Sequence, residues 1–311
     1  MDTVNKPIVV VGSINMDLVA HTRQIPSPGQ TVTGTGFETT PGGKGANQAV
    51  AAARLGYPVK MVGAVGAPRG GSFDTFGQAL LDNLAQAGVD TAAVARFAGP
   101  SGVASILIAD NGENSIVVVP GANGEMDCAA IDLHAPLIRS AGMVLCQLEL
   151  PLETVAHTLA LCAQAGVPVI LDPAPAAPLP DAVFHQTTWF TPNETEAAFY
   201  LGNSPAPEQA AQQLLDKGLK GVVLKRGAEG SYVAVQGKAA WIKPFPVQAV
   251  DTVAAGDCFN GAFAVALLEG NDPWAAARYA SAAAAISVTR RGAQASMPSR
   301  AEVDAFLAER Q

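Results

Sequence analysis

Short apolar runs alternate along the chain with longer, alanine-rich segments of helical character. Ile8–Val11 is a continuous β-branched run, which is typical of a strand buried on both faces. Further strands are expected at Lys60–Val65, Met143–Leu148, Val167–Leu171, Trp189–Thr191 and Gly221–Lys225, a hairpin at Ser231–Ile242, and helices at Gly45–Leu55, Thr154–Gln164, Glu194–Leu201, Glu208–Lys217, Asp257–Leu268, Trp274–Val288 and Arg300–Glu309. This alternation predicts an α/β fold with a doubly wound, mostly parallel sheet flanked by helices.

Two β-rich stretches interrupt the alternation. Gly102–Ala109 and Ser115–Val119 flank the pair Asn111-Gly112, and Asn-Gly between apolar strands predicts a hairpin. Asp17–Gln24 and Gln30–Phe37 are also strand-like. We expect these pieces to form a small antiparallel β lid, built from about residues 17–40 and 97–122, on a single domain that spans residues 1–311.

Composition narrows the classes of partner. With 49% hydrophobic and 15% charged residues, the chain has the composition of a folded globular protein. A net charge of -8 without a basic block disfavours nucleic-acid binding. No apolar run is long enough to cross a membrane, Met1–Pro7 lacks a signal-peptide core, and the cysteines and histidines have no metal-site spacing. These features predict a cytoplasmic protein with no membrane partner.

A run of small residues precedes Asp257. Ala254, Ala255 and Gly256 stand at the start of a predicted apolar helix, where a ligand can approach the backbone and free N–H groups bind anions. A carboxylate beside such amides can take a proton from a hydroxyl while the amides stabilise phosphoryl oxygens. Asp257 is therefore a candidate catalytic base. The alternative is that it only caps the helix.

A glycine-rich turn, Pro41-Gly42-Gly43-Lys44-Gly45, begins another predicted helix. It is not a Walker A loop, because Gly45 stands where Ser or Thr is required. No Gly-x-Gly-x-x-Gly follows the first strand, so a dinucleotide site is not indicated. Lys44 and Asn47 can hydrogen-bond sugar hydroxyls, although a tight strand-to-helix turn would also explain the glycines.

Polar residues follow two of the predicted strands. Asn15 and Asp17 come after the first strand, and Glu149 follows Met143–Leu148. Ligands of open α/β sheets bind beyond the carboxyl ends of the strands. Acidic groups there would repel a substrate that already carries a phosphate, which favours a neutral sugar.

Two later motifs have a structural and a functional interpretation. Asn193 and Glu196 have the spacing of a helix capping box, and they can also face magnesium-bound phosphates. The turn Lys225-Arg226-Gly227-Ala228-Glu229-Gly230 is either a hairpin entry or a nucleotide contact.

At these motifs, in this order along nearly the whole chain, the sequence resembles the ribokinase-like carbohydrate kinase family. Further matching segments are Gly121-Ala122-Asn123, Asp172-Pro173-Ala174-Pro175 and Ala282–Gln294. The resemblance implies ATP-dependent transfer of a phosphoryl group to the 5-hydroxyl of D-ribose, with Mg²⁺, K⁺ activation and a homodimer formed through the lids. Two departures are Lys225, where Thr is frequent, and the turn Ala67-Pro68-Arg69-Gly70-Gly71.

The resemblance also implies a role for each matching position. Asp257 corresponds to the base and Ala254, Ala255 and Gly256 to the anion hole. The sugar-binding positions are Asn15, Asp17, Gly43, Lys44, Asn47 and Glu149. The magnesium and nucleotide positions are Asn193, Glu196, Lys225, Gly227, Gly230, Gly256 and Ser281. The K⁺ positions are Asp251, Val253, Ser287, Arg290, Gly292 and Ser296, several of them through backbone oxygens.

Two other hypotheses stay open from the residues. A kinase for deoxyribose, fructose or a nucleoside such as adenosine would use the same base, although 6% aromatic residues offer little for a base pocket. A non-catalytic sugar-binding protein would have no need of a carboxylate aimed at an anion site.

Overall fold

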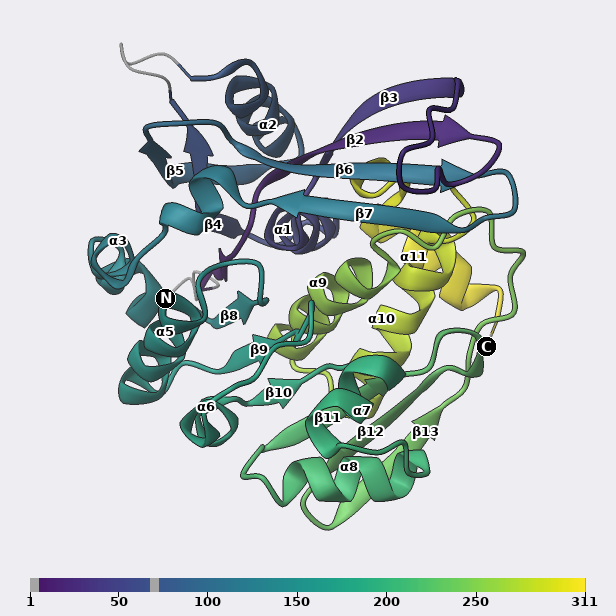
Figure 1. Cartoon of the computed structure of the whole chain (residues 1–311). Coiled ribbons are helices and arrows are strands. Elements are labelled where there is room, and N and C mark those ends of the chain that lie inside the picture. The colour runs from purple at the N-terminus through teal and green to yellow at the C-terminus, as the bar shows by residue number, and fades with distance from the viewer. Residues whose placement is uncertain (1–5, 68–72, 311) are drawn as a thin grey trace.

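The computed structural model describes residues 6–67 and 73–310, and within these ranges nine strands form the main sheet (Figure 1). Their order is β13 (Lys238–Ile242), β12 (Ser231–Val235), β11 (Gly221–Lys225), β10 (Trp189–Phe190), β9 (Val169–Leu171), β8 (Met143–Cys146), β1 (Ile8–Val11), β4 (Val59–Gly66) and β5 (Val89–Phe97). In this order the strands from β11 to β5 pair in parallel, with β1 among them, and β12 and β13 add an antiparallel hairpin. The chain builds outward from β1 in both directions, which confirms the predicted doubly wound α/β sheet.

Helices cover both faces of this sheet. Successive residues of β1 point to opposite faces, so Ile8 and Val10 belong to one core cluster and Val9 and Val11 to the other. One face is covered by α1 (Lys44–Arg54), α2 (Thr75–Gln86), α9 (Ala255–Leu268), α10 (Pro273–Ser287) and α11 (Arg300–Ala308), and the other by α3 (Cys128–Asp132), α4 (Ala135–Ser140), α5 (Leu152–Ala165), α6 (Asp181–Gln186), α7 (Glu194–Leu201) and α8 (Pro207–Leu215). Burial on both faces explains why the central strands are apolar throughout.

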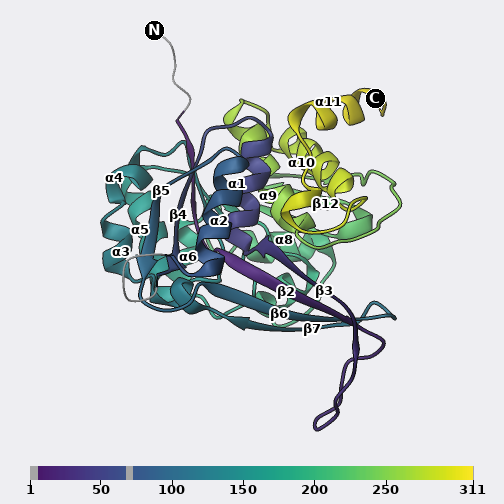
Figure 2. The same ribbon diagram turned by 90° about the horizontal axis from the view of Figure 1, so that it is seen from above.

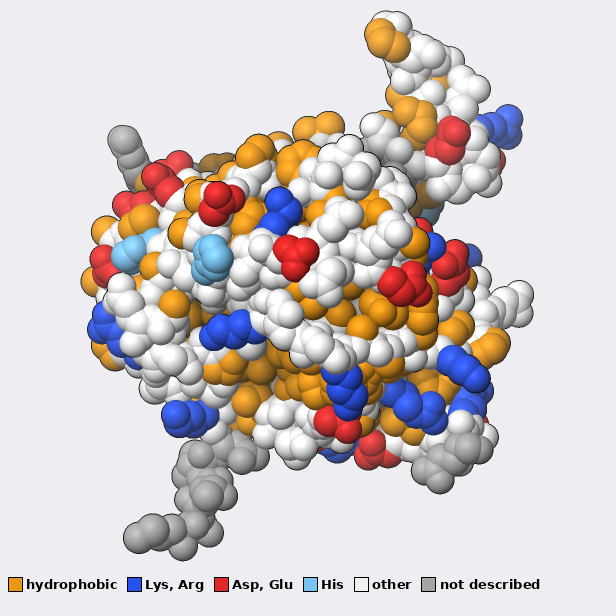
Figure 3. Space-filling model, turned by 90° about the horizontal axis from the view of Figure 1, so that it is seen from below, with side chains coloured by type: hydrophobic (Ala, Val, Ile, Leu, Met, Phe, Trp, Pro, Cys, Tyr) orange, Lys and Arg blue, Asp and Glu red, His pale blue; other side chains and the backbone are white. Residues whose placement is uncertain are grey.

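A second, four-stranded sheet lies beside the ends of the main sheet (Figure 1). Its order among the described residues is β3 (Gly34–Gly42), β2 (Asn15–Thr22), β6 (Gly102–Ala109) and β7 (Asn114–Val119). The outer pairs are antiparallel, including the hairpin predicted at Asn111-Gly112, whereas β2 and β6 run parallel at the centre. The segment between β2 and β3 projects from the body (Figures 2 and 3).

Several local features differ from the sequence-based expectation. α2 and β5 were not predicted, because α2 buries only Gly77, Leu80 and Leu84 and β5 alternates with polar residues. The strand expected over Gln30–Phe37 begins only at Gly34. The unusual turn at 67–71 falls largely outside the described residues. No helix of the described ranges is both long and apolar enough to span a bilayer.

Candidate active site

Asp257 lies in the first turn of α9, and it is not the helix cap. The N-cap is Ala254, whose φ of 57° makes it the one non-glycine residue with positive φ in the described part of the chain. The first α-helical bond runs from the Cys258 N–H to the Ala254 carbonyl at 2.9 Å, so the amides of Gly256 and Asp257 precede the helical ladder. A strained backbone that presents early amides is typical of an anion-binding helix start.

Asp257 is 4% exposed, and its carboxylate is held by two amide side chains of α1. Asn47 Nδ2 donates to Oδ2 and Gln48 Nε2 donates to Oδ1, each at 3.0 Å. Burial raises the pKa of Asp257, and Asp172 adds to the rise, while Lys44 and the two amides oppose it. The structure therefore contains a buried carboxylate with an increased affinity for protons at the start of a helix.

The predicted sugar-binding residues converge beside Asp257 from β2, the β3–α1 turn and the segment after β8. Asn15 Oδ1 accepts from Asn123 Nδ2 at 2.7 Å, which fixes the orientation of its amide. Glu149 Oε2 accepts from the Lys44 N–H at 3.1 Å and from the Ser13 hydroxyl. Gly43 has φ 87°, and a Cβ there would lie 2.7 Å from the Asn15 nitrogen, so this close turn requires glycine.

Two charged groups of this cluster have shifted proton affinities. Burial raises the pKa of Asp17 to about 7, with further contributions from Glu149 and Asp257. Burial would lower the pKa of Lys44, but Asp257, Asp172, Glu149 and Glu196 outweigh it and hold the pKa above its ordinary value. Lys44 therefore stays an ammonium group among carboxylates.

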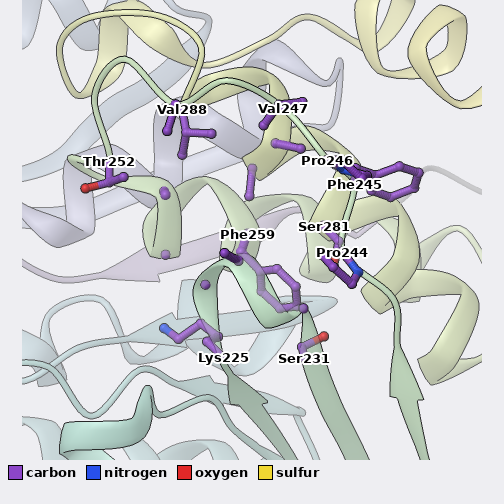
Figure 4. A pocket seen from close by; sticks show the side chains of 18 residues that line it. Lys225, Ser231, Pro244, Phe245, Pro246, Val247, Thr252, Phe259, Ser281 and Val288 are labelled. Carbon is purple, nitrogen blue, oxygen red and sulfur yellow. The ribbon is translucent and has the colours of Figure 1, made fainter.

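A largely apolar cavity of about 340 Å³ lies on the other side of the α9 start (Figure 4). Phe259, the strand ends at Lys225 and Ser231, the segment Pro244–Val247, and Val288 line it. The predicted nucleotide residues Lys225, Gly227, Gly230, Gly256 and Ser281 all line this cavity. Its size and lining are suited to a planar, mostly apolar group.

A second, polar cavity adjoins the first, since Lys225, Gly227, Thr252, Ala255 and Gly256 line both. It is also lined by Lys44, Asp172, Asn193, Glu194, Glu196, Ala254 and Asp257. Asn193 and Glu196 form the capping box of α7, with both reciprocal bonds at 2.8 Å. The structural and the functional interpretation of this motif are therefore compatible, because the capped helix begins at the cavity.

The six positions that the resemblance assigned to K⁺ lie in two adjoining segments near the α9 start, residues 251–253 and 287–296. The Asp251 carboxylate accepts from the Val253 N–H at 3.0 Å and from the Gly292 N–H at 2.9 Å, and the Val288 carbonyl accepts from the Val250 N–H at 2.7 Å. Ser287 is the last residue of α10, and Arg290 and Ser296 lie in the segment that follows it. No group of three metal-ligating side chains occurs in residues 6–67 and 73–310, but a site of backbone oxygens would not need one.

Sequence reasoning missed part of the network around Asp257. Asp172 follows β9, and its carboxylate accepts from Gln48 Nε2 at 3.0 Å and from Lys225 Nζ at 2.9 Å. Gln147 in turn donates to Gln48 at 2.8 Å. A polar residue directly after a parallel strand was the available signal for Asp172, whereas nothing in the helix pattern distinguished Gln48.

A cluster of hydrogen-bonding side chains, a buried carboxylate at a helix start and an adjoining apolar cavity are together typical of a phosphotransferase for small alcohols. The profile of the pfkB family of carbohydrate kinases matches residues 5–300, and the chain belongs to this family. It is 44% identical to the ribokinase of Bacillus subtilis, covering 96% of this chain and 99% of the relative, and 42% identical to the ribokinase of Haemophilus influenzae, covering 97% and 98%. The structure of Arabidopsis thaliana ribokinase complexed with ribose and ATP is similar at a TM-score of 0.89 and 36% identity, covering 97% of this chain and 98% of that one.

Proposed function

We propose that this carbohydrate kinase transfers the γ-phosphoryl group of ATP to the 5-hydroxyl of D-ribose. The observation that carries the proposal is the buried Asp257 carboxylate, which lines a polar cavity continuous with the apolar one. The similarity of this chain to relatives named ribokinase, and to the Arabidopsis thaliana ribokinase structure complexed with ribose and ATP, supports ribose as the acceptor.

In this proposal Asp257 removes the proton of the sugar hydroxyl as that oxygen attacks the γ-phosphorus. Asn47 and Gln48 hold the carboxylate, so little reorganisation is needed in the transition state. The anion hole assigned to Ala254, Ala255 and Gly256 stabilises the phosphoryl oxygens chiefly through the Gly256 amide, because the Ala255 N–H already donates to the Thr252 carbonyl at 3.3 Å. Asn15, Asp17, Gly43, Lys44, Asn47 and Glu149 bind the sugar hydroxyls.

The nucleotide is assigned to the two adjoining cavities. The apolar one accommodates the adenine beside Gly227, Gly230 and Ser281, and the triphosphate extends past Lys225 toward Gly256. The polar cavity is lined by two ammonium groups, Lys44 and Lys225, and by four carboxyl groups, Asp172, Glu194, Glu196 and Asp257. Because the carboxyl groups outnumber the ammonium groups, a triphosphate would be repelled unless it binds together with a divalent cation. Asn193 and Glu196 would hold Mg²⁺ through waters, and bound Mg²⁺ would neutralise charge on the phosphates.

Activation by K⁺ is part of the proposal. Asp251, Val253, Ser287, Arg290, Gly292 and Ser296 would hold the ion, largely through backbone oxygens. The hydrogen bonds of Asp251 to Val253 and Gly292 support this, since they tie both segments together a few residues before Ala254. An ion there would order the start of α9, where the anion hole lies.

We also propose that two lids pair in a homodimer. β7 is an edge strand, and four of its residues are 47–61% exposed: Ile116, Val117, Val118 and Val119. Phe37 of β3 is 67% exposed. An exposed apolar edge strand is a liability in a monomer and is suited to association with a second lid.

The acceptor is tested by ADP release from MgATP with D-ribose, 2-deoxyribose, fructose and adenosine, each with and without K⁺. We expect the highest kcat/KM with ribose, stimulation by K⁺, and a product whose phosphate is on C5 by ³¹P and ¹³C NMR. A preference for another acceptor would keep the kinase and replace the substrate. Absence of turnover with every acceptor, in folded protein that binds ATP, would contradict the proposal.

A further inference from the structure

Lys225 forms a largely buried ion pair at the junction of the two cavities. Its Nζ lies 2.9 Å from Asp172 Oδ1, and the side chains of Lys225 and Asp172 are 15% and 2% exposed. The other Asp172 oxygen accepts from Gln48 Nε2 at 3.0 Å, and the same nitrogen donates to Asp257. Lys225 is thus connected to the proposed base through two hydrogen-bonded side chains.

The Lys225 ammonium also lies at the anion hole. A Cβ placed on Gly256 would be only 3.3 Å from Lys225 Nζ, so glycine at 256 leaves room for this ammonium beside the helix start. An ammonium group has three N–H donors, and Asp172 occupies one of them. An oxygen bound to the Gly256 amide would therefore lie beside the remaining donors of Lys225.

We propose that Lys225 is a fixed cation for the phosphoryl group during transfer, and that Asp172 is the residue that positions it. The inference rests on the phosphotransfer proposed above and adds two roles to it. A lysine side chain is flexible, and tethering its ammonium before ATP arrives removes most of that freedom. Asp172 is itself fixed, because it follows β9 directly and is held by Gln48.

A purely structural ion pair is the competing explanation, since the contact also joins the ends of β9 and β11. The two explanations differ in what the loss of Lys225 does to catalysis. A structural pair would change stability and leave kcat nearly unaltered. A cation aimed at the transferring group would change kcat and ATP affinity, with little effect on sugar KM.

The test compares Lys225→Met, Asp172→Asn and the double variant with Lys220→Met, an exposed lysine just before β11 that serves as the control. We expect Lys225→Met to lower kcat by about 100-fold or more, with sugar KM changed less than about threefold. Asp172→Asn should lower kcat by about tenfold, because Lys225 loses its tether. Lys225→Arg should recover part of the loss.

A pH profile adds a readout that a structural role would not produce. Lys44 of α1, Asp17 of β2 and Asp172 face Asp257. Removing Lys225 leaves Asp172 without a counter-ion, and the uncompensated charge should raise the pKa of Asp257 further. The acid limb of the kcat profile should therefore move to higher pH by about one unit in Lys225→Met. In the double variant the limb should return to its wild-type position while kcat stays low. The double variant removes both buried charges together, so it is informative even if Lys225→Met folds poorly.

Calorimetric titration with MgATP and MgADP tests the inference without any sugar. Lys225→Met should weaken ATP binding by about tenfold and ADP binding by less than about threefold, because the ammonium faces the transferring group. A kcat within about threefold of wild type together with an unchanged ratio of ATP to ADP affinity would overturn the inference. Failure of the wild type on ribose would instead count against the proposed acceptor alone, and the kinetic comparison would use the acceptor that is turned over.

Discussion

Asn47 Nδ2 lies 3.0 Å from Asp257 Oδ2, although 210 positions separate the two residues in the sequence. The contact depends on close packing of α1 against α9. A Cβ on Gly261 would lie 2.7 Å from the Ala51 Cβ, so a larger residue at 261 would push the helices apart. Small residues between two helices thus place an amide donor on the proposed catalytic base.

The raised pKa of Asp17 predicts opposite effects of pH on sugar binding and on stability. An ionised carboxylate is the better acceptor for sugar hydroxyls, so sugar KM should fall by up to about tenfold between pH 6 and pH 8. An unfolded chain ionises Asp17 near 3.8, whereas the folded chain keeps the proton to about pH 7. The stability contributed by this group is therefore fully present below about pH 3.8 and is lost progressively as pH rises to about 7.

Asp17→Asn should remove both effects. The variant should show a weak, pH-independent sugar KM. Without ligand at pH 8 its free energy of unfolding in urea should exceed that of the wild type, by at most about 4 kcal/mol. A variant that is less stable than the wild type at pH 8 would show that Asp17 supports the fold.

Gly43→Ala should be strongly destabilising. The added Cβ would lie 2.7 Å from the Asn15 nitrogen and would also force alanine to adopt φ 87°. Gly166→Ala is the matched control, because Gly166 has φ 69° with nothing within 4 Å of its Cβ position. We expect the free energy of unfolding, measured in urea, to fall by about 1 kcal/mol in the control and by at least about 2 kcal/mol more in Gly43→Ala. Equal losses would mean that the clash is relieved at no cost.

Asp251→Ala should uncouple the enzyme from K⁺. Without the carboxylate, the N–H groups of Val253 and Gly292 lose their acceptor and the two segments lose their connection. We expect the K⁺ concentration for half-maximal activation to rise at least about tenfold, measured in ADP-release assays at constant ionic strength. A K⁺ response like that of the wild type would place the cation elsewhere.

Val117→Lys tests the association of lids. A charge in the middle of the exposed β7 edge should oppose strand-to-strand pairing, so analytical ultracentrifugation should show monomers for the variant and dimers for the wild type. Lys238→Ala, on the far edge of the main sheet, serves as the control. An unaltered dimer in Val117→Lys would assign the interface to another surface.

The sequence was sufficient for the sheet, apart from its edge strand β5, and for the polar ends of its strands, because apolar runs such as Ile8–Val11 are typical of buried strands in an α/β chain. It was not sufficient for α2, because this helix buries only Gly77, Leu80 and Leu84 and its apolar pattern is too weak to predict a helix. Asp172 and Gln48 were missed for another reason. Their importance lies in contacts that span 53 to 209 positions, and residue spacing does not encode such contacts.

The central claim is that Asp257 removes the proton of a sugar hydroxyl, and Asp257→Asn tests it most directly. We would measure ADP release with D-ribose for the wild type and the variant, together with ribose affinity by calorimetry. The amide keeps the size of the side chain but cannot accept the proton, so kcat should fall by about 10⁴-fold while ribose affinity stays within about threefold. A variant that loses ribose binding but keeps its turnover at saturation would contradict the account.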